Sequence, residues 1–300
     1  MSRKLTASTA LLLTAAPLLW AGNAIVGRLV REAVPPMTLN LLRWSLALLI
    51  LLPLGRAVFV RGSGVLRGWR RYSLLGLFGV GLYNALQYLA LQTSTPINVT
   101  LVAAGMPVWM MLVGALFFHA PLRRRQIVGA LLSIAGVLLV LARGDWQQLL
   151  ALRLVPGDLF MVLATICWSF YSWLLIQPQD RPALRADWAA FLLAQVMYGV
   201  VWSGALAAVE WGSGPRHIAW SWQLAAVLAF VAIGPALTAF RCWGAGVQRA
   251  GPTIAAFFSN LTPLFAALMS LAFLHEAPHL YHLAAFALIV GGIAWSSRAA

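Results

Sequence analysis

The sequence predicts an all-α integral membrane protein with ten transmembrane helices, arranged as two inverted five-helix repeats. Three observations lead to this prediction: the composition is apolar, apolar stretches recur along the chain, and the two halves resemble each other. Of the 300 residues, 62% are hydrophobic and 9% are charged, against about 25% charged in an average soluble domain. Such a chain cannot bury its apolar surface inside one water-soluble globule, so its solvent is lipid.

The apolar stretches have the length that a membrane-spanning helix needs, about 20 residues. Most connections between them are short, so consecutive helices are expected to be antiparallel neighbours. The first stretch follows two basic residues and also resembles a signal peptide, but it has a counterpart later in the chain and is expected to stay in the fold. The ten expected helices cover residues 8–28, 37–55, 71–92, 96–118, 126–142, 157–177, 188–209, 221–243, 252–274 and 280–297.

The net charge of +14 reflects membrane topology. Fifteen of the 21 Lys and Arg residues fall on one side of the predicted membrane, in the two termini, in alternate connections or in the helix ends next to them. The positive-inside rule makes that side, and both termini, cytoplasmic. Basic connections also suit anionic lipid headgroups, and no nucleic-acid partner is expected.

The two halves align without a gap when the chain is shifted by 156 residues. Five helices is an odd number, so the second copy, residues 144–300, enters the membrane from the side opposite to the first, residues 1–143. Inverted repeats are typical of transporters; the alternative is a duplication that only enlarges a bundle. A weaker match at 148 places Trp20 on Trp168. The pairs at 156 include Gln92 and Gln248, Pro96 and Pro252, Pro107 and Pro263, His119 and His275, and Gly136 and Gly292.

Residues 275–279 have the letters H-E-x-x-H of a zinc hydrolase. That pattern binds zinc only when both histidines lie one helical turn apart on the same face. Pro278 resists such a helix, His275 aligns with His119, whose segment has no zinc motif, and His282 is the only nearby third ligand. We therefore expect a turn, no metal and no cofactor. Phosphate-binding motifs of nucleotide hydrolases are also missing from the sequence, and no enzyme activity is expected.

The repeat, prolines inside the fourth and ninth helices, the run FLHEAP closing the ninth and the ending LIVGGIAW of the tenth resemble the EamA group of the drug/metabolite transporter superfamily. One departure is visible: Ala120 stands where such proteins often have an acidic residue, so a role for Glu276 need not be symmetric. The resemblance implies a multi-pass protein of the bacterial inner membrane that exports small metabolites. The chain is similar to the aromatic amino-acid exporter branch of this group.

A substrate site is expected near the midplane of the membrane. The resemblance implies that the first, third, fourth, sixth, eighth and ninth helices enclose it. Amides can hydrogen-bond a zwitterion, while Trp and Tyr faces accept apolar, aromatic or cationic groups. Asn84, Ser169 and Thr238 lie at similar depth. The predicted substrate-binding residues are Trp20, Asn23, Tyr83, Gln87, Trp109, Trp168, Tyr171 and Asn260.

Other tryptophans lie closer to helix ends and are expected to form interfacial belts. These are Trp44, Trp69, Trp146 and Trp222.

Prolines inside helices remove backbone hydrogen bonds and kink the helix. Here they act either as gates or only in packing. The kink residues are Pro17, Pro107, Pro235 and Pro263.

Two further features are expected to be structural. Arg43 and Arg241 lie inside expected helices, where a charge is costly. The alternatives for Arg43 are binding of an anion or hydrogen bonds to backbone carbonyls, and Arg241 can snorkel to the surface; structural use is expected of both. Gly129, Ser133 and Gly136 share one helix face and predict tight helix contact, within a monomer or across a weak homodimer.

Together these features predict an exporter of aromatic and other neutral amino acids, such as phenylalanine, methionine and threonine, working by alternating access. Its partners are a small-molecule substrate and the lipid bilayer. Every Asp, Glu and His maps to a helix end or a loop, so proton coupling is not expected. The alternatives are a multidrug, cation or nucleotide-sugar carrier, an intramembrane zinc hydrolase, and a membrane scaffold or lipid scramblase.

Overall fold

The protein is helical throughout the part that the structure describes. The computed structural model describes residues 5–30, 32–60, 62–94, 96–142, 145–151, 153, 155–274 and 280–297, and these contain no strand. The predicted all-α class is therefore confirmed. Among these residues, eight helices are long and apolar enough to cross a membrane, or nine if one bent pair counts as a single span. The number of ten spans stays a prediction.

The longer elements of the first half fall on the first five expected segments. The elements are α1 (Ala7–Leu29), α2 (Pro36–Leu54), the 3-10 turn η1 (Arg56–Phe59), α3 (Trp69–Leu75), the π-helix η2 (Gly76–Leu82), α4 (Tyr83–Thr93), α5 (Pro96–Ala104), α6 (Met106–Phe118) and α7 (Arg124–Ala142). The short η1 lies between the second and the third segment. Three elements, α3, η2 and α4, cover the third segment, and two, α5 and α6, cover the fourth.

The second half repeats this order after a short connection that contains α8. Its elements are α8 (Gln147–Leu150), α9 (Pro156–Leu175), α10 (Pro182–Ala186), α11 (Trp188–Gly212), α12 (Trp222–Val231), the π-helix η3 (Ala232–Thr238), α13 (Ala239–Ala250), α14 (Pro252–Ser259), α15 (Leu261–Leu274) and α16 (Leu280–Ser297).

The bounds of these elements repeat at the same spacing of 156 residues as the sequence. Both ends of η2 and η3 are 156 positions apart, and so are the first residues of α4 and α13 and of α7 and α16. A π-helix is rare and costs regular hydrogen bonding, so two in matched places indicate that both copies have kept the same local distortion.

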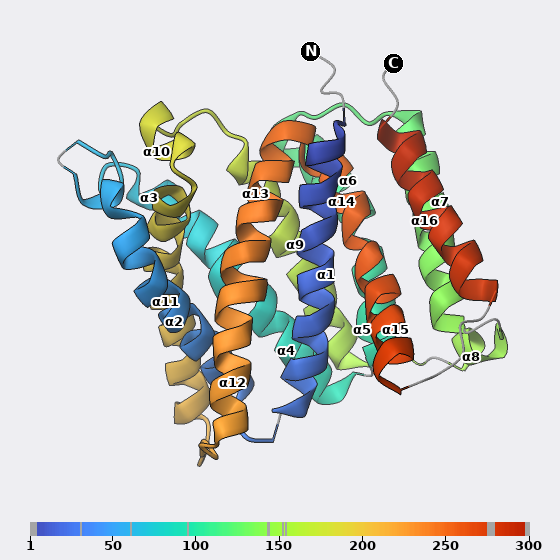
Figure 1. The fold of residues 1–300 in the computed structure, drawn as a ribbon, viewed down its shortest axis with the longest axis horizontal. Coiled ribbons are helices and arrows are strands. Elements are labelled where there is room, and N and C mark those ends of the chain that lie inside the picture. Colours follow the sequence, from blue (N-terminus) through green and yellow to red (C-terminus); the bar gives the residue numbers. More distant parts are fainter. Residues whose placement is uncertain are drawn as a thin grey trace.

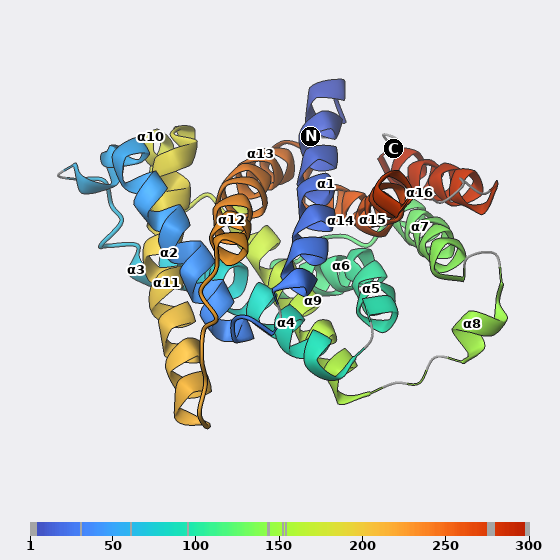
Figure 2. The ribbon, with the colours of Figure 1, turned by 60° about the horizontal axis from the view of Figure 1, so that its bottom comes forward.

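Helices of the two halves lie side by side across the whole molecule (Figure 1). α2 packs on α11 at one end, α7 packs on α16 at the other, and α1, α4, α9 and α13 lie between these pairs. Figure 2 shows the same order from a second direction. The start of α1 and the end of α16 lie at the same edge of the molecule (Figure 1).

Small residues hold α7 against α16. A Cβ added to Gly129 would lie 2.7 Å from the carbonyl oxygen of Gly292, and one added to Gly136 would lie 2.9 Å from that of Ala285. Rising numbers on α7 meet falling numbers on α16, so these matched helices are antiparallel. The tight contact expected of the glycine face is therefore made within the chain.

The fourth and ninth expected helices are both interrupted just before a proline. α5 and α6 are bent by 43° at Gly105, two residues before Pro107. α14 ends at Ser259 and α15 begins at Leu261, two residues before Pro263. Pro17 lies within the continuous α1 and Pro235 lies within η3.

A carboxylate from the second half caps the first turn of α2. Glu210, near the end of α11, accepts hydrogen bonds from the backbone nitrogens of Met37 and Thr38, each at 2.9 Å, and from the Thr38 hydroxyl at 2.7 Å. The first turn of a helix has unpaired N–H groups and a partial positive charge. Glu210 therefore accepts hydrogen bonds from two free N–H groups in the first turn of α2 and joins α2 to α11.

Candidate functional site

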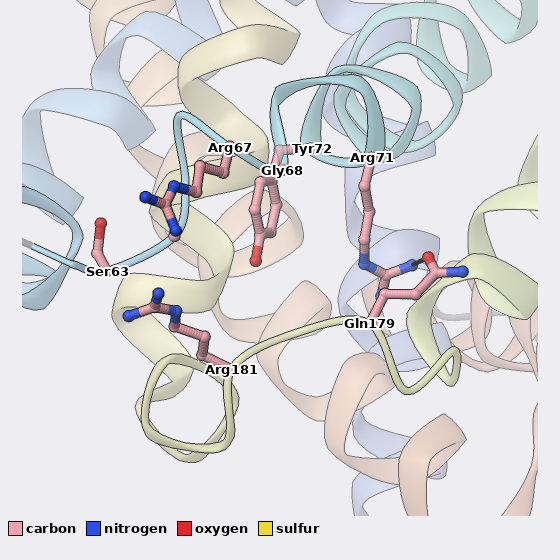
Figure 3. A pocket seen from close by; sticks show the side chains of 8 residues that line it. Ser63, Arg67, Gly68, Arg71, Tyr72, Gln179 and Arg181 are labelled. Carbon is pink, nitrogen blue, oxygen red and sulfur yellow. Dashed lines mark hydrogen bonds between the residues drawn. The ribbon is translucent and has the colours of Figure 1, made fainter.

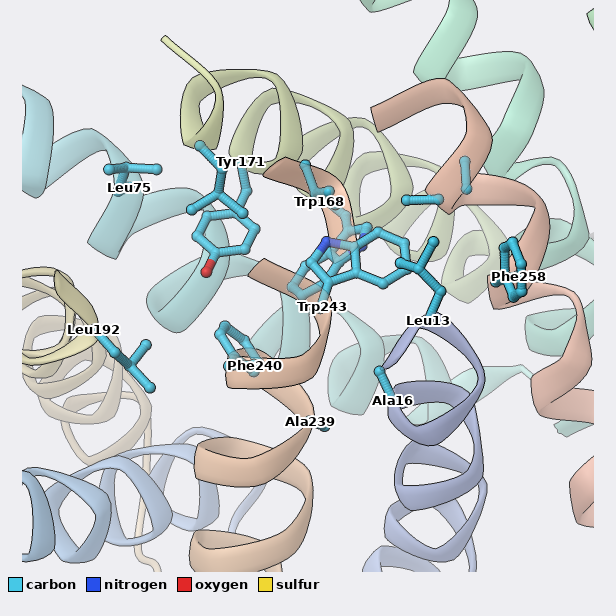
Figure 4. Packing of buried hydrophobic residues seen from close by; sticks show 14 of the residues in the cluster. Leu13, Ala16, Leu75, Trp168, Tyr171, Leu192, Ala239, Phe240, Trp243 and Phe258 are labelled. Atoms are coloured by element: carbon cyan, nitrogen blue, oxygen red, sulfur yellow. The ribbon is translucent and has the colours of Figure 1, made fainter. Parts of the chain in front are cut away.

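An aromatic cluster lies where α1, α4, α9 and α13 meet. Trp168, on α9, is at its centre and is only 1% exposed. Aromatic pairs at such distances stabilise by about 0.5–1.5 kcal/mol each beyond their burial. The ring centroid of Trp168 lies 4.7 Å from Tyr83, 5.0 Å from Tyr171, 5.2 Å from Trp20, 5.3 Å from Phe240 and 5.5 Å from Trp243. Figure 4 shows the members from α9 and α13 beside Leu13 and Ala16 of α1.

Hydrogen bonds fix the orientation of two indoles in this cluster. Trp20 donates to the carbonyl oxygen of Pro235, in η3, at 3.3 Å. Trp243 donates to the hydroxyl of Ser172 at 3.1 Å. Buried indole N–H groups need such partners, and each bond joins a ring to an element other than its own.

The second feature is a polar cluster directly beside the aromatic one. Arg43, in the middle of α2, is fully buried. Its Nη1 donates to Asn84 Oδ1 at 3.0 Å and to the Tyr88 hydroxyl at 3.3 Å, both on α4. Tyr83 precedes Asn84 in the sequence, and its ring contacts that of Trp168. Trp44 follows Arg43, and its ring centroid lies 4.8 Å from that of Phe240. The two clusters therefore share a boundary.

Several donors of this polar cluster have no hydrogen-bond partner among the described residues. They are Arg43 Nε and Nη2, Asn84 Nδ2 and Trp44 Nε1. Arg43 also has no ion pair with any carboxylate of the described residues. A buried donor left unpaired costs about 1–3 kcal/mol, and an uncompensated buried charge costs several. This is an expensive arrangement for packing alone.

The structure brings four of the eight predicted substrate-binding residues into the aromatic cluster: Trp20, Tyr83, Trp168 and Tyr171. Gln87 lies one helical turn after Tyr83 on α4.

The other three predicted residues lie apart from the rings. Asn23, on α1, is buried and its Oδ1 has no hydrogen-bond partner in the part of the chain that the structure describes. The Trp109 indole lies against Gly105, at the bend between α5 and α6. Asn260 donates to the carbonyl oxygen of Ala104 at 3.3 Å and to the Ser133 hydroxyl at 2.9 Å. In this structure its amide therefore joins the two interrupted helices.

Sequence reasoning missed Phe240 and Trp243 as members of the cluster. A signal for them existed, because the shift of 156 residues places Asn84 on Phe240 and Gln87 on Trp243. Matched helix faces are therefore polar on α4 and aromatic on α13.

The belt assignment of Trp44 was wrong. Trp44 is fully buried, because it lies in the middle of α2 and packs on Phe240. Trp69, Trp146 and Trp222 are 52%, 55% and 81% exposed, and their place in an interfacial belt stays a prediction.

A separate pocket of about 250 Å³ lies in the connections at one edge of the molecule (Figure 3). Its Arg71 binds the Asp180 carboxylate through two nitrogens, Nε at 2.7 Å and Nη2 at 2.6 Å, and Tyr72 donates to the same carboxylate at 3.0 Å. The pocket lining is Ser63, Gly64, Arg67, Gly68, Arg71, Tyr72, Gln179 and Arg181.

The H-E-x-x-H pattern at residues 275–279 lies outside the described residues, so its expected turn stays a prediction. Within the residues that are described, no group of three His, Cys, Asp or Glu side chains is placed to bind a metal ion.

Comparison with known proteins then decides the family. Residues 7–142 and residues 155–298 each match the EamA-like transporter family. The chain belongs to this family. It is therefore a multi-pass membrane transporter of the drug/metabolite transporter superfamily, and both halves carry the family's pattern.

EamA-like relatives match most of the chain. An uncharacterized transporter of Archaeoglobus fulgidus is 26% identical, over 96% of this chain and 95% of the relative. The aromatic amino acid exporter YddG of Ancylobacter novellus is 27% identical, over 87% of this chain and 88% of the relative. A solved crystal structure is 26% identical and superposes with a TM-score of 0.73, covering 97% of this chain and 96% of the other.

Proposed function

We propose that this protein exports small metabolites, above all aromatic and other neutral amino acids, by alternating access around the Trp168 cluster. The observation that carries the proposal is that both halves of the chain contribute rings to this cluster. Trp20 and Tyr83 come from the first half and Trp168, Tyr171 and Phe240 from the second. A rocking motion of one repeat against the other would open a site at such a boundary to each side in turn.

The chemistry of the cluster suits an amino acid with an apolar side chain. Aromatic faces bind apolar and aromatic groups, and a small-molecule site needs only a few polar groups for orientation. One relative, at 27% identity, carries the name aromatic amino acid exporter. That name supports the same substrate class for this chain, ahead of drug-like cations and nucleotide sugars.

Transport is proposed to run downhill without proton coupling. Proton-coupled carriers hold ionisable groups inside the membrane, whereas Asp158, Glu210 and Asp180 lie at helix ends or in a connection and are each held by hydrogen bonds. Uphill accumulation that disappears when the pH gradient is dissipated would contradict this part of the proposal.

The proposed setting is a bacterial inner membrane, with ten spans in two inverted repeats and both termini cytoplasmic. It is supported by the distribution of basic residues, by the shared edge of the α1 start and the α16 end (Figure 1), and by the antiparallel packing of the matched helices α7 and α16.

The test is flux of labelled phenylalanine, methionine and threonine into liposomes that contain the purified protein. We expect saturable flux that excess unlabelled substrate blocks. Trp168→Ala should abolish it, because that substitution removes the ring that all others contact. Trp168→Phe, which keeps an apolar ring, should raise KM with less loss of maximal rate.

Trp222→Ala is the matched control, since Trp222 is 81% exposed and lies at the first residue of α12, a helix that contributes no ring to the cluster. It should leave the flux unchanged. Each variant is first shown to elute as a single species in size-exclusion chromatography. Wild-type flux no greater than that of protein-free liposomes, for all three amino acids, would overturn the substrate assignment and favour cations, nucleotide sugars or lipids.

A further inference from the structure

The donor cluster at Arg43 favours the anion-binding alternative over a purely structural use of this residue. All four buried atoms without a partner there are donors: Arg43 Nε and Nη2, Asn84 Nδ2 and Trp44 Nε1. Water is kept away, because Arg43 is fully buried and Asn84 is only 4% exposed. Donors alone, together with a fixed positive charge, select an anionic acceptor.

The free edge of Arg43 has the geometry of a carboxylate site. Its Nη1 is used by Asn84 and Tyr88, which leaves Nε and Nη2, the side-on edge of the guanidinium. These two parallel N–H groups match the two oxygens of a carboxylate. Arg71 shows this use elsewhere in the chain, because its own Nε and Nη2 hold the two oxygens of Asp180.

Asn84 carries a further unpaired donor. Its Oδ1 accepts from Arg43 Nη1 at 3.0 Å, so the amide is oriented with its acceptor toward Arg43. Its Nδ2 has no hydrogen-bond partner among the described residues.

The location connects this edge to the ring cluster. Asn84 follows Tyr83, whose ring contacts Trp168 at 4.7 Å, and Arg43 precedes Trp44, whose ring contacts Phe240 at 4.8 Å. One molecule with an anionic group and an apolar side chain could therefore contact both clusters.

We infer that Arg43, with Asn84, binds the carboxylate of the transported amino acid, while the Trp168 cluster receives its side chain. The inference rests on the proposed function and deepens it. It restricts the substrates to molecules with a free carboxylate, so the corresponding amides and amines, which lack that charge, are poor substrates. It also explains a cation in the middle of α2 that has no carboxylate partner among the described residues.

The first experiment compares three compounds as competitors of labelled phenylalanine flux in liposomes: phenylalanine, phenylalaninamide and phenethylamine. Only phenylalanine should compete with wild-type protein at concentrations near its KM. Arg43→Met keeps the length of the side chain and removes the charge; it should raise the KM for phenylalanine by about tenfold or more and abolish discrimination against the amide.

Arg241→Met is the matched control, because Arg241 is an exposed arginine of α13 that lies over the Trp188 ring at 4.5 Å. It should leave KM and discrimination unchanged. Wild-type flux of phenylalanine together with an Arg43→Met protein of unchanged KM and unchanged discrimination would overturn the inference and leave the proposed function standing. Absence of wild-type flux would overturn the proposed function instead.

Asn84→Asp separates binding from folding if Arg43→Met fails to fold. The new carboxylate would pair with Arg43 inside the protein, so thermal stability in detergent should rise. Substrate binding should fall, because the added carboxylate at Nη1 neutralises Arg43 and repels the carboxylate of the substrate. A stabilised Asn84→Asp protein that transports phenylalanine with the wild-type KM would show that Arg43 is structural.

Thermal shift distinguishes the substrate carboxylate from an inorganic anion at the same edge. Phenylalanine, phenylalaninamide and sodium chloride are added separately to wild-type and Asn84→Asp protein. We expect stabilisation by phenylalanine alone, and only in the wild type. Equal stabilisation by chloride, lost in Asn84→Asp, would assign the edge to an inorganic ion and overturn the inference.

Discussion

Single glycines decide how closely the rings of the site can pack. A Cβ added to Gly79, in η2, would lie 2.5 Å from the Tyr171 ring, well inside van der Waals contact. Tyr171 in turn contacts Trp168 and Phe240, at 5.0 and 5.7 Å between ring centroids. The position of the rings on α9 therefore depends on a missing side chain in the other half.

Gly79→Ala is expected to destabilise the protein by about 1–3 kcal/mol, the usual cost of overpacking a filled core. The affinity for substrate should fall as well, because Tyr171 must move. Thermal unfolding in detergent and the KM for phenylalanine measure the two effects.

Gly244→Ala is the control for this substitution. Gly244 lies in α13 with nothing within 4 Å of an added Cβ, so alanine should be neutral or stabilise the helix by about 0.5–1 kcal/mol. Equal stability changes in the two variants would contradict the overpacking explanation.

At the scale of elements, irregular helices occur in matched pairs that contact the opposite half. η2 packs on α11 and η3 packs on α2. Asn260, at the interruption before α15, donates to the carbonyl oxygen of Ala104, at the interruption before α6. Backbone groups freed by an irregular turn need partners inside a membrane, and here the other repeat supplies one.

The Glu210 cap predicts a graded loss of stability. Glu210→Gln keeps an acceptor for the first turn of α2 but loses the charge that interacts with the helix dipole, and Glu210→Ala loses both. We expect costs of about 0.5–1 kcal/mol and 1–2 kcal/mol respectively, measured by thermal unfolding in detergent. If glutamine were as damaging as alanine, charge rather than hydrogen bonding would hold α2.

At the scale of the whole molecule, the two repeats keep the same elements but differ in chemistry. The matched faces of α4 and α13 carry Asn84 and Gln87 on one side and Phe240 and Trp243 on the other. A zwitterion with an apolar side chain has the same two parts. The difference between these matched helices therefore gives the proposed site a polar side on α4 and an apolar side on α13.

The proposed topology is tested by labelling cysteines in intact cells with a membrane-impermeant maleimide. Cys167 and Cys242 are first replaced by alanine, and one cysteine is introduced as Ser63→Cys or His217→Cys. The connection of α2 and α3, which contains Ser63, and that of α11 and α12, which contains His217, lie at opposite edges (Figure 1).

We expect His217→Cys to react from outside, and Ser63→Cys to react only after permeabilisation, because the basic connections stay in the cytoplasm. The reverse pattern would place the termini outside and contradict export in the proposed orientation.

The sequence by itself determined the class of the protein and the position of its helices. Composition and the length of apolar stretches are local quantities, and they decide what a segment does in lipid. The shift of 156 residues likewise gave the repeat, and the structure places both π-helices in register with it. The sequence also allowed us to predict four members of the aromatic cluster, because large or polar side chains at the middle of a span are unusual. These are Trp20, Tyr83, Trp168 and Tyr171.

Only the tertiary structure decided which side chains face one another. Trp44, expected at an interface, is buried against Phe240, and the amide of Asn260, expected at the substrate, joins two interrupted helices. The unpaired edge of Arg43 depends on what α4 supplies and on the absence of a carboxylate nearby among the described residues. Such facts come from the rotation and approach of packed helices, which glycines such as Gly79 permit, and no local pattern in the sequence encodes them.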